Sequence, residues 1–392
     1  MTRLSLMFFA FTFAASVVSA TTCGGNFQTF LSYMKKEARQ KGHSPESIQR
    51  FFATAARDFK TIEADRSQGI FQIPFVEFSN RLISKHRIDH AAKNLKKYAS
   101  IFDRVESRFG VPREILAAFW AFETDFGAVQ GQFNTLNSLL TLAHDCRRPE
   151  LFHPQVFAAL KLYERGNFDP TTTQGAWAGE VGMVQMLPED ILFNGIDGDG
   201  DGLISLKTSV PDAMMSGANL LKSLGWRANE PWLQEVTLPS DLDLSLTGLR
   251  TEKTVREWEG LGILSRSGEF QSANVTTSII LPQGQFGPAF ITYPNFKVLF
   301  EWNQSFVYVT TVAYFATILG GTKRFKNTKP EAGLDDSEMK TLQRKLVSLG
   351  FDVGKIDGIL GAKTRSAIQS VQKKLGIPAD AWPTKKLVLK LN

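Results

Sequence analysis

The sequence predicts a mainly α-helical protein of the α+β class, with a helical body, a small β-containing insertion and a small C-terminal helical module. Three observations support this prediction. Apolar residues recur at helical spacing through most of residues 27–221. Short β-rich pieces replace that pattern between residues 232 and 292. A polar stretch with Gly and Pro, at residues 321–335, has the composition of a linker and precedes a compact last segment, residues 336–392.

Composition describes an ordinary globular chain. Its 392 residues are 43% hydrophobic and 21% charged, which suits two or three domains. The formal net charge of +6 is compatible with an anionic polymer as partner. However, the Lys and Arg residues are scattered and no nucleic-acid-binding motif accompanies them, so we expect no nucleic-acid partner.

The N-terminus reads as a signal peptide, residues 1–20. Arg3 precedes an apolar run at residues 4–18, and Ser19 and Ala20 supply the small residues of a cleavage site. The run is shorter than the ~20 residues that span a bilayer. Thr22, not a small residue, precedes Cys23, which argues against a lipid anchor. We therefore expect a soluble, exported protein of the periplasm.

The two cysteines, Cys23 and Cys146, lie far apart in the sequence. In an oxidising compartment such a pair is most simply one disulfide, which would attach the mature N-terminus to the body. Two buried free thiols are the alternative. A metal role is disfavoured because no further Cys or His completes a ligand set.

Within the first predicted domain, residues 21–320, amphipathic segments predict helices, and Gly- and Pro-punctuated pieces predict strands. The helices fall at residues 27–42, 91–110, 154–166 and 211–226. The β-containing subdomain, residues 232–292, has β-rich pieces at residues 233–239, 275–285 and 289–294. It also has one predicted helix, at residues 251–262. A last helix at residues 305–319 returns to the body.

The C-terminal segment predicts a small helical bundle of three helices. Two apolar stripes at helical spacing flank an Asp-Gly turn at residues 357–358; they comprise Leu342, Leu346 and Leu349, and Ile368, Val371 and Leu375. About sixty residues bury only a small core, so a binding module is expected here and not an enzyme.

Glu123 is the most informative ionisable residue. It lies in the last turn of a nearly all-apolar helix that Pro112 opens and Gly127 ends. A helix that is apolar all round is buried, so this carboxyl group should hold its proton to higher pH, as a general acid must near neutrality. Asp125 is two positions on and points to a different side, so it is not an obvious catalytic partner.

Several other classes of functional site are excluded because their motifs are absent from the sequence. The sequence has no His-Glu-x-x-His and no Gly-x-Ser-x-Gly, and residues 361–364 lack the glycine spacing of a phosphate loop. His86 and His90 are one helical turn apart, but without a third ligand we interpret them as an exposed face.

The segment "IDGDGDGLIS" resembles the opening of a calcium loop. Asp197, Asp199 and Asp201 stand at alternate positions, and the Leu203 carbonyl is a further ligand candidate. The twelfth position is Thr208 and not Glu, but Asp212 could close a longer loop. A metal-free Asp-Gly turn is the alternative.

Two neutral amides stand in segments suited to sugars. Gln185 follows close-packing glycines in "WAGEVGMVQMLPED", and Asn303 lies among aromatic residues in "EWNQSFVY". A helix cap or a satisfied buried amide is the alternative interpretation for each residue.

Together these segments resemble the lytic murein transglycosylase B family, lysozyme-like enzymes that cleave peptidoglycan glycan strands without water. The resemblance covers most of the mature chain and rests on "CGGNF", "GVPREILAAFWAFETDFG", "HDCRRPELF", "AGEVGMVQMLPED", "DGDGDG" and "NFKVLFEWNQSFVY".

The resemblance implies roles for particular residues. Glu123 would be the single catalytic acid and base. The substrate-binding positions would be Gln185, Met186, Trp302, Asn303, Tyr308 and the paired Arg147 and Arg148. The cysteine positions match a disulfide of the family, and the Asp197 loop, with its later aspartate, matches the family's calcium loop.

The implied reaction breaks the bond between N-acetylmuramic acid and N-acetylglucosamine. Glu123 would protonate the glycosidic oxygen and then deprotonate the sugar's own 6-hydroxyl, giving a 1,6-anhydro product. No cofactor is required for this chemistry, and calcium would be structural. The C-terminal segment is similar to peptidoglycan-binding modules, so the expected partners are glycan strands and peptide stems; we expect a monomer, and the sequence identifies no envelope protein partner.

Four cleft positions depart from the family's usual residues: Ala176 for Ser, Glu180 for Ala, Met186 for Phe and Trp302 for Tyr. Two alternatives to the transglycosylase therefore stay open. One is a muramidase-type hydrolase that uses water with Glu180 as partner. The other is a catalytically weak, wall-binding scaffold protein.

Overall fold

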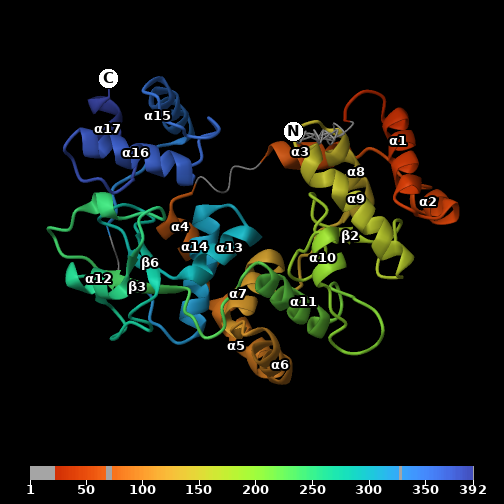
Figure 1. Cartoon of the computed structure of the whole chain (residues 1–392), viewed down its shortest axis with the longest axis horizontal. Helices are drawn as coiled ribbons and strands as arrows, with labels where there is room; N and C mark the ends of the chain where they lie inside the picture. The colour runs from red at the N-terminus through yellow and green to blue at the C-terminus, as the bar shows by residue number, and fades with distance from the viewer. Residues whose placement is uncertain (1–22, 68–72, 326–328, 392) are drawn as a thin grey trace, which may run out of the picture.

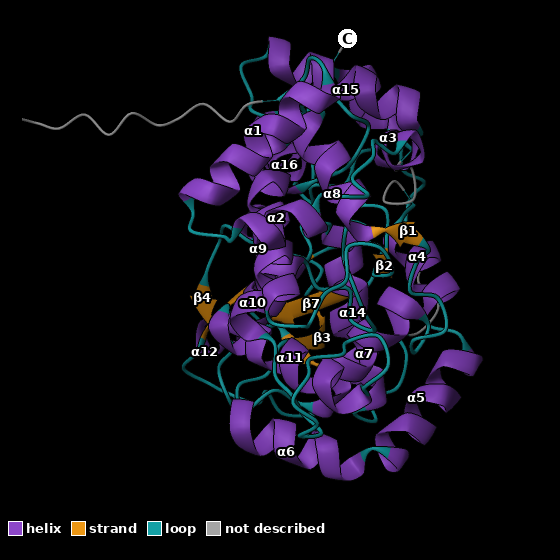
Figure 2. Ribbon diagram, turned by 90° about the vertical axis from the view of Figure 1, so that its right-hand side faces the viewer, coloured by secondary structure: helices purple, strands orange, loops and turns teal. Residues whose placement is uncertain are grey.

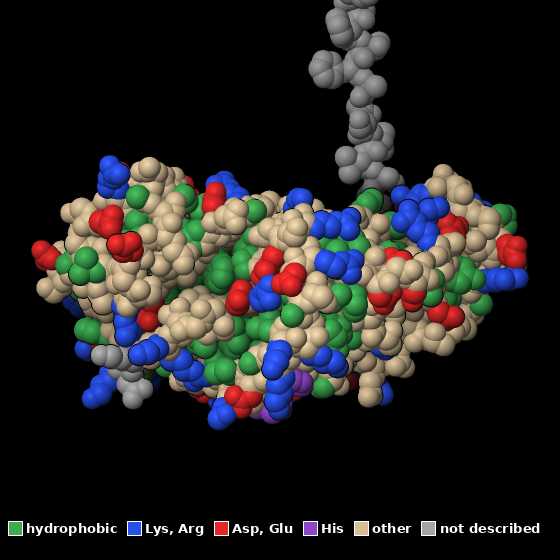
Figure 3. Space-filling model, turned by 90° about the horizontal axis from the view of Figure 1, so that it is seen from below, with side chains coloured by type: hydrophobic (Ala, Val, Ile, Leu, Met, Phe, Trp, Pro, Cys, Tyr) green, Lys and Arg blue, Asp and Glu red, His purple; other side chains and the backbone are tan. Residues whose placement is uncertain are grey.

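The computed structural model describes residues 23–67, 73–325 and 329–391 (Figure 1). The predicted signal peptide, residues 1–20, lies outside the described residues. Within the described residues no helix is both long and apolar enough to cross a membrane. Lys and Arg side chains are interspersed with Asp and Glu on the face seen in Figure 3, in line with their scatter along the sequence.

Helices form the body, which confirms the predicted mainly α class. The first part of the body contains α1 (Phe27–Gln40), α2 (Pro45–Phe51), α3 (Phe59–Arg66), α4 (Phe75–Leu82), α5 (Lys85–Lys97), α6 (Ala99–Phe109) and α7 (Arg113–Thr124). It continues with α8 (Thr135–His144), α9 (Pro149–Glu164), α10 (Pro188–Asn194), α11 (Val210–Ser223), α13 (Pro294–Trp302) and α14 (Phe306–Leu319). A two-stranded ribbon joins β1 (Phe133–Asn134) to β2 (Gln174–Gly175).

The segment predicted as one helix, residues 91–110, is divided between α5 and α6. Tyr98 ends the first helix and begins the second, with ψ of 27°. Its ring packs edge-on against Trp120, with ring centroids 5.9 Å apart. Helix propensity is favourable on both sides, so the break is a feature of tertiary packing that local periodicity does not encode.

The insertion forms a five-stranded antiparallel sheet in the order β4-β6-β7-β3-β5. Its elements are β3 (Leu233–Thr237), β4 (Lys253–Thr254), α12 (Val255–Gly260), β5 (Leu264–Ser265), β6 (Thr276–Ile280) and β7 (Ala289–Thr292). The predicted helix at residues 251–262 is shorter than expected because residues 253–254 pair with β6. Trp258, Ile279 and Ile291 are among the residues of a separate small core.

The C-terminal segment folds into α15 (Asp336–Ser348), α16 (Ala362–Lys374) and α17 (Lys385–Lys390). Leu342, Leu346, Ile368 and Val371 lie in its core, as predicted. The last member of each predicted stripe does not: Leu349 is 48% exposed and Leu375 is 38% exposed. Both residues are helix C-caps, where the chain turns away from the core.

The C-terminal module packs against the β-containing insertion and the start of α14 (Figure 1). The Gln369 side chain donates to the carbonyls of Leu244 (3.1 Å) and Thr247 (2.9 Å). Arg365 donates to the Pro282 carbonyl at 2.7 Å, and its guanidinium lies 4.3 Å from the centre of the Phe306 ring. The module is therefore docked through side chains that reach across the boundary.

Helix α7 lies at the centre of the body and packs against α5, α6, α11 and α14. Figure 2 shows α15 at the opposite end of the molecule from α5 and α6. Eight of the twelve residues of α7 are buried, which explains how a helix with so few polar side chains is accommodated. Glu123 lies near the C-terminal end of α7, so the central position of this helix determines the surroundings of Glu123.

Candidate active site

A cavity of about 1340 Å³ runs past the C-terminal end of α7. Its lining includes residues of α3, α4, α7, α9, α10 and α11, of the turn at residues 176–187, of the connection between α13 and α14, and of the C-terminal module. Among the predicted site residues, the lining contains Glu123, Arg148, Gln185, Met186, Trp302 and Asn303. Residues far apart in the sequence are thus brought to one site.

Glu123 lies in the last turn of α7 and faces this cavity, as the apolar helix predicts. Burial raises the pKa of its carboxyl group to about 7, and the nearby charge of Glu180 adds to the increase. Hydrogen bonds from Tyr308 and Trp302 act in the opposite direction. The Tyr308 hydroxyl donates to Glu123 Oε1 at 2.5 Å. Near neutral pH this carboxyl group can therefore both give and take a proton.

The end of α7 keeps Asp125 out of the cavity lining. Asp125 caps the helix in the left-handed region, with φ of 49°, and its Oδ1 accepts a 3.0 Å hydrogen bond from Arg87 Nε. The preceding Thr124 hydroxyl donates to the Met183 carbonyl at 2.6 Å. This bond attaches the end of α7 to the next wall of the site.

The turn at residues 176–187 presents Gln185 and Met186 to the cavity. A bridge between Val181 and Met186 closes it, and Gln185 has a positive φ of 54°, which is uncommon for a non-glycine residue. The Gln185 side-chain amide donates to the Gly182 carbonyl at 2.7 Å. Gly182 itself is required, because a Cβ there would lie 2.4 Å from the Cβ of Leu206.

Trp302 and Asn303 stand where α13 passes into α14. The Trp302 ring stacks on Phe119 of α7, with centroids 4.3 Å apart and planes 24° apart. Asn303 Oδ1 accepts from the Ser305 N–H at 2.9 Å, and Ser305 caps α14. Asn303 therefore has the turn-forming role of the alternative interpretation and lines the cavity as well.

The arginine pair is organised by Asp65, a residue that the sequence did not single out. Arg147 and Arg148 both donate to Asp65 Oδ1, and the Asp65 side chain is only 1% exposed. Arg148 lines the cavity, whereas Arg147 is not among its lining residues. The only signal for Asp65 was an acidic residue on the apolar side of a short helix, and its partners lie about eighty residues later.

Glu180 is a second carboxyl group in the cavity lining. Burial raises its pKa, while hydrogen bonds from backbone N–H groups and the charge of Arg148 lower it. Its Oε2 atom is buried and has no hydrogen-bond partner among the described residues. Glu123 and Glu180 therefore have different hydrogen-bonding surroundings.

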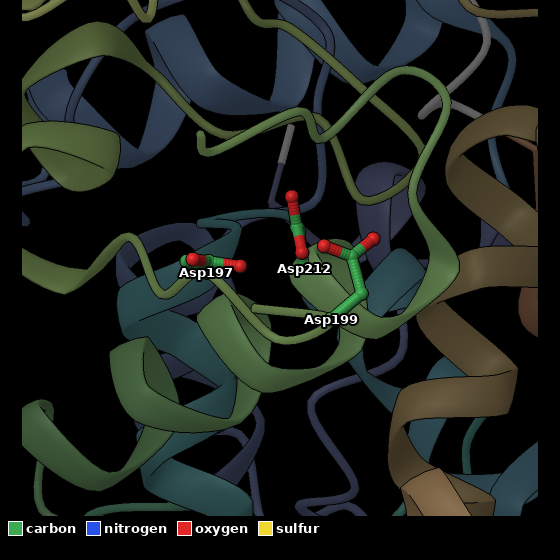
Figure 4. Close-up of side chains that lie close together, drawn as sticks. All are labelled: Asp197, Asp199 and Asp212. Atoms are coloured by element: carbon green, nitrogen blue, oxygen red, sulfur yellow. The ribbon is translucent and has the colours of Figure 1, made fainter. Parts of the chain in front are cut away.

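The predicted calcium loop brings together three of its four aspartates. Carboxylate oxygens of Asp197, Asp199 and Asp212 lie within 4.8 Å of one another, and Figure 4 shows them converging. Asp212 is fully buried and accepts the N–H groups of Gly198 (2.8 Å) and Ser205 (2.7 Å). Asp201 is outside this group, and its Oδ1 accepts the Leu203 N–H at 2.8 Å.

Cys23 and Cys146 form a disulfide, with Cα atoms 5.2 Å apart. The bond holds the start of α1 beside the end of α8, where the Gly24 N–H also donates to the His144 carbonyl at 2.8 Å. The first described residues of the chain are thereby attached to the body.

The C-terminal module also supplies cavity residues that sequence reasoning missed. They include Gly358, Leu360, Arg365 and Trp382. Trp382 Nε1 donates to the Glu331 carbonyl at 3.0 Å, so the end of the predicted linker packs on the module. Local sequence patterns indicated a separate bundle and carried no signal that it would border the site.

The helical body, with the Glu123 carboxyl group at the wall of a large cavity, has the fold of the lysozyme-like class of proteins. The chain belongs to the transglycosylase SLT domain family, whose model matches residues 26–317. The model of a peptidoglycan binding domain matches residues 335–391. These matches confirm both predicted resemblances.

Known proteins agree with this assignment. The membrane-bound lytic murein transglycosylase B of Escherichia coli K12 is 26% identical over 242 residues, which are 61% of this chain and 65% of that protein's length. SltB3 of Pseudomonas aeruginosa, in complex with NAG-NAM-pentapeptide, is 34% identical with a TM-score of 0.85; the match covers 94% of this chain and all of that one. Slt35 of Escherichia coli, in complex with calcium, shares the fold at 22% identity and a TM-score of 0.64, covering 79% of this chain and 98% of that one.

Proposed function

We propose that the protein is a lytic transglycosylase that cleaves the β-1,4 bond between N-acetylmuramic acid and N-acetylglucosamine in peptidoglycan. The observation that carries this proposal is Glu123, a half-buried carboxyl group that lines a large cavity and whose pKa is raised to about 7. Family membership supports it, as does a relative with 34% identity whose crystal structure holds a glycan-peptide fragment.

In the proposed reaction, protonated Glu123 gives its proton to the glycosidic oxygen while the bond from that oxygen to the anomeric carbon breaks. The resulting carboxylate then takes the proton of the same sugar's 6-hydroxyl, whose oxygen bonds to the anomeric carbon. The product is a 1,6-anhydromuramoyl end. Since the nucleophile belongs to the substrate, one acid-base group suffices.

The surrounding residues would bind and orient the sugars. Gln185 and Asn303 offer amide groups to hydroxyl and acetamido groups, and the exposed part of Trp302 offers an apolar face. The Tyr308 hydroxyl would stabilise the Glu123 carboxylate after proton transfer. Arg148 would contact substrate directly, and Arg147 would act through the Asp65 pair.

Digestion of purified peptidoglycan followed by mass spectrometry tests the proposal. The wild-type protein should release anhydro-ended muropeptides, and Glu123→Gln should release almost none. Reducing ends without anhydro ends would indicate the muramidase-type hydrolase. Unchanged digestion by Glu123→Gln would move the site elsewhere, and no digestion by either protein would favour the wall-binding scaffold.

We further propose that the Asp197 loop binds a structural calcium ion. The donor set fits: three carboxylates converge within 4.8 Å, and hard oxygen ligands are those that calcium prefers. Asp197, Asp199, Asp212 and the Leu203 carbonyl would hold the ion, with Asp201 as an outer member. The ion would offset the repulsion between the clustered carboxylates, and the glycosidic chemistry would need no cofactor.

We propose export to the periplasm as a monomer. The signal-like residues 1–20 support export, and the disulfide between Cys23 and Cys146 suits an oxidising compartment. Peptidoglycan glycan strands and peptide stems would be the partners. Fractionation of cells that produce the full chain tests the periplasmic location. Size-exclusion chromatography of the purified protein tests whether it is a monomer.

A further inference from the structure

Glu180 reaches the cavity from a backbone that is tightly fixed. Its carbonyl oxygen accepts the Ala176 N–H at 2.9 Å, and the bridge between Val181 and Met186 follows directly. Gly175 packs so closely on this carbonyl that a Cβ there would lie 1.9 Å from the Glu180 oxygen. These close backbone contacts fix the position of the turn that carries Glu180.

One oxygen of the Glu180 carboxyl group, the buried Oε2, lacks a hydrogen-bond partner in the part of the chain that the structure describes, although the backbone N–H groups of Glu180 and Ala178 act on the carboxyl group. Arg148 is the cation that acts on it, but its Nη2 atom is engaged with Asp65, and its buried Nε has no hydrogen-bond partner among the described residues. A buried carboxyl oxygen without a partner costs free energy, so a functional role is the simplest reason for its presence.

We propose that Glu180 is a positioning residue for the proton of Glu123: both residues line the same cavity, and the negative charge of Glu180 disfavours a second negative charge on Glu123. The catalytic acid would thereby stay protonated toward neutral pH. This inference rests on the proposed function of Glu123 and adds a residue that acts on it.

Two other side chains near Glu123 lower its pKa, which is opposite to the effect of Glu180. Tyr308, from α14, and Trp302, from the end of α13, donate hydrogen bonds that favour the carboxylate. Burial in the apolar wall favours the acid, and Glu180 is the charged group that reinforces this effect. Asp125, two positions after Glu123, is paired with Arg87. Because two carboxyl groups interact, the apparent pKa values belong to the pair.

The pH dependence of kcat/KM on purified glycan strands tests the proposal. In Glu180→Gln, loss of the charge should lower the pKa of Glu123 and move the alkaline limb to lower pH by roughly half a unit to one unit. Activity on that limb should fall about three- to tenfold relative to the acidic plateau of the same variant. Glu259→Gln is the matched control, because it removes an exposed carboxylate on the outside of α12.

A measurement without substrate separates this inference from the proposed reaction. The Glu123 carboxyl carbon can be titrated by NMR in glutamate-labelled protein, with Glu123→Gln used to assign the signal. Its midpoint should be lower in Glu180→Gln than in wild type and unchanged in Glu259→Gln. An unchanged midpoint in folded Glu180→Gln, or an equal shift in the control, would overturn the proposal even if the enzyme is active. A protein that fails to cleave peptidoglycan but shows the shift would contradict only the proposed reaction.

Discussion

At the scale of single residues, the environment of Glu123 is a balance of opposing effects. Burial among apolar side chains favours the neutral acid, whereas the 2.5 Å hydrogen bond from Tyr308 favours the carboxylate. The result is a pKa of about 7, against 4.5 for an ordinary glutamate. A group with this pKa suits a reaction in which one residue serves as acid and then as base.

The raised pKa predicts a cost in stability. The folded protein holds a proton on Glu123 that the unfolded chain loses between pH 4.5 and about 7, so this contribution to stability is lost as pH rises through that window. Glu123→Gln removes the ionisable group and should be more stable than wild type above pH 7, by on the order of 2 to 3 kcal/mol. Urea unfolding at pH 8 and pH 4.5 checks this. An equal difference between the two proteins at both pH values would contradict it.

The hydrogen bond from Tyr308 lowers the pKa of Glu123, whereas the charge of Glu180 raises it. Removal of Tyr308 should therefore shift the pH profile of activity in the opposite direction to removal of Glu180. Tyr308→Phe removes the hydrogen bond that stabilises the Glu123 carboxylate, so the alkaline limb of kcat/KM should move to higher pH. The rate should also fall by roughly tenfold to a hundredfold, because the carboxylate forms during the reaction. Tyr33→Phe, at an exposed tyrosine of α1, should change neither quantity. A limb that moves to lower pH would refute this account of Tyr308.

At the scale of elements, caps and turns place the site residues. Helix α7 ends at Asp125 in a left-handed cap, and α14 begins at Ser305 beside Asn303. The loop after α10 shows the same principle, since Asp212, in the first turn of α11, accepts backbone N–H groups from two parts of that loop. Most of the predicted helices exist because local apolar periodicity encodes them, but their ends depend on such caps.

The proposed calcium site predicts a metal-dependent stability. Added Ca²⁺ should raise the Tm of wild type over chelator-treated protein, by an amount that grows with ligand concentration. Asp199→Asn should weaken this increase, because Asp199 is an exposed member of the cluster whose loss leaves the backbone contacts of Asp212 in place. Asp241→Asn, an exposed aspartate outside the cluster, is the control. An equal Tm of the wild-type protein with Ca²⁺ and with chelator would contradict the proposed calcium site.

At the scale of the whole molecule, the C-terminal module is part of the wall of the cavity. Arg365 crosses from α16 to the catalytic body, where it contacts Phe306 and the Pro282 carbonyl. Burial lowers the pKa of this arginine to about 9. Under the proposed function, glycan strands bound by the module would be presented at a fixed position, which a flexible tether does not provide.

Arg365 should determine how firmly the module is docked. Arg365→Ala removes a stacking contact and hydrogen bonds to the carbonyls of Leu281 and Pro282, so the module should separate more readily. Small-angle scattering should show a larger radius of gyration, and amide exchange near residues 369–382 should rise. Arg344→Ala, at an exposed arginine of α15, should behave as wild type. Identical scattering of the two variants would show that other contacts hold the module.

The sequence by itself determined the helical body, the β-containing insertion, the three-helix module and the family. It also predicted that Glu123 lies in an apolar helix with a raised pKa, because an acid within such a helix is a local signal. Such features depend on periodicity and on short motifs, which residues carry independently of distant partners.

Only the tertiary structure decided which separate segments meet. It placed Arg148 at the cavity and left Arg147 outside its lining, joined both to Asp65, and set Glu180 in the same cavity as Glu123. It also made the C-terminal module a wall of the site. The physical reason is that burial and pairing between distant residues depend on how complete elements pack, and no local pattern records that packing.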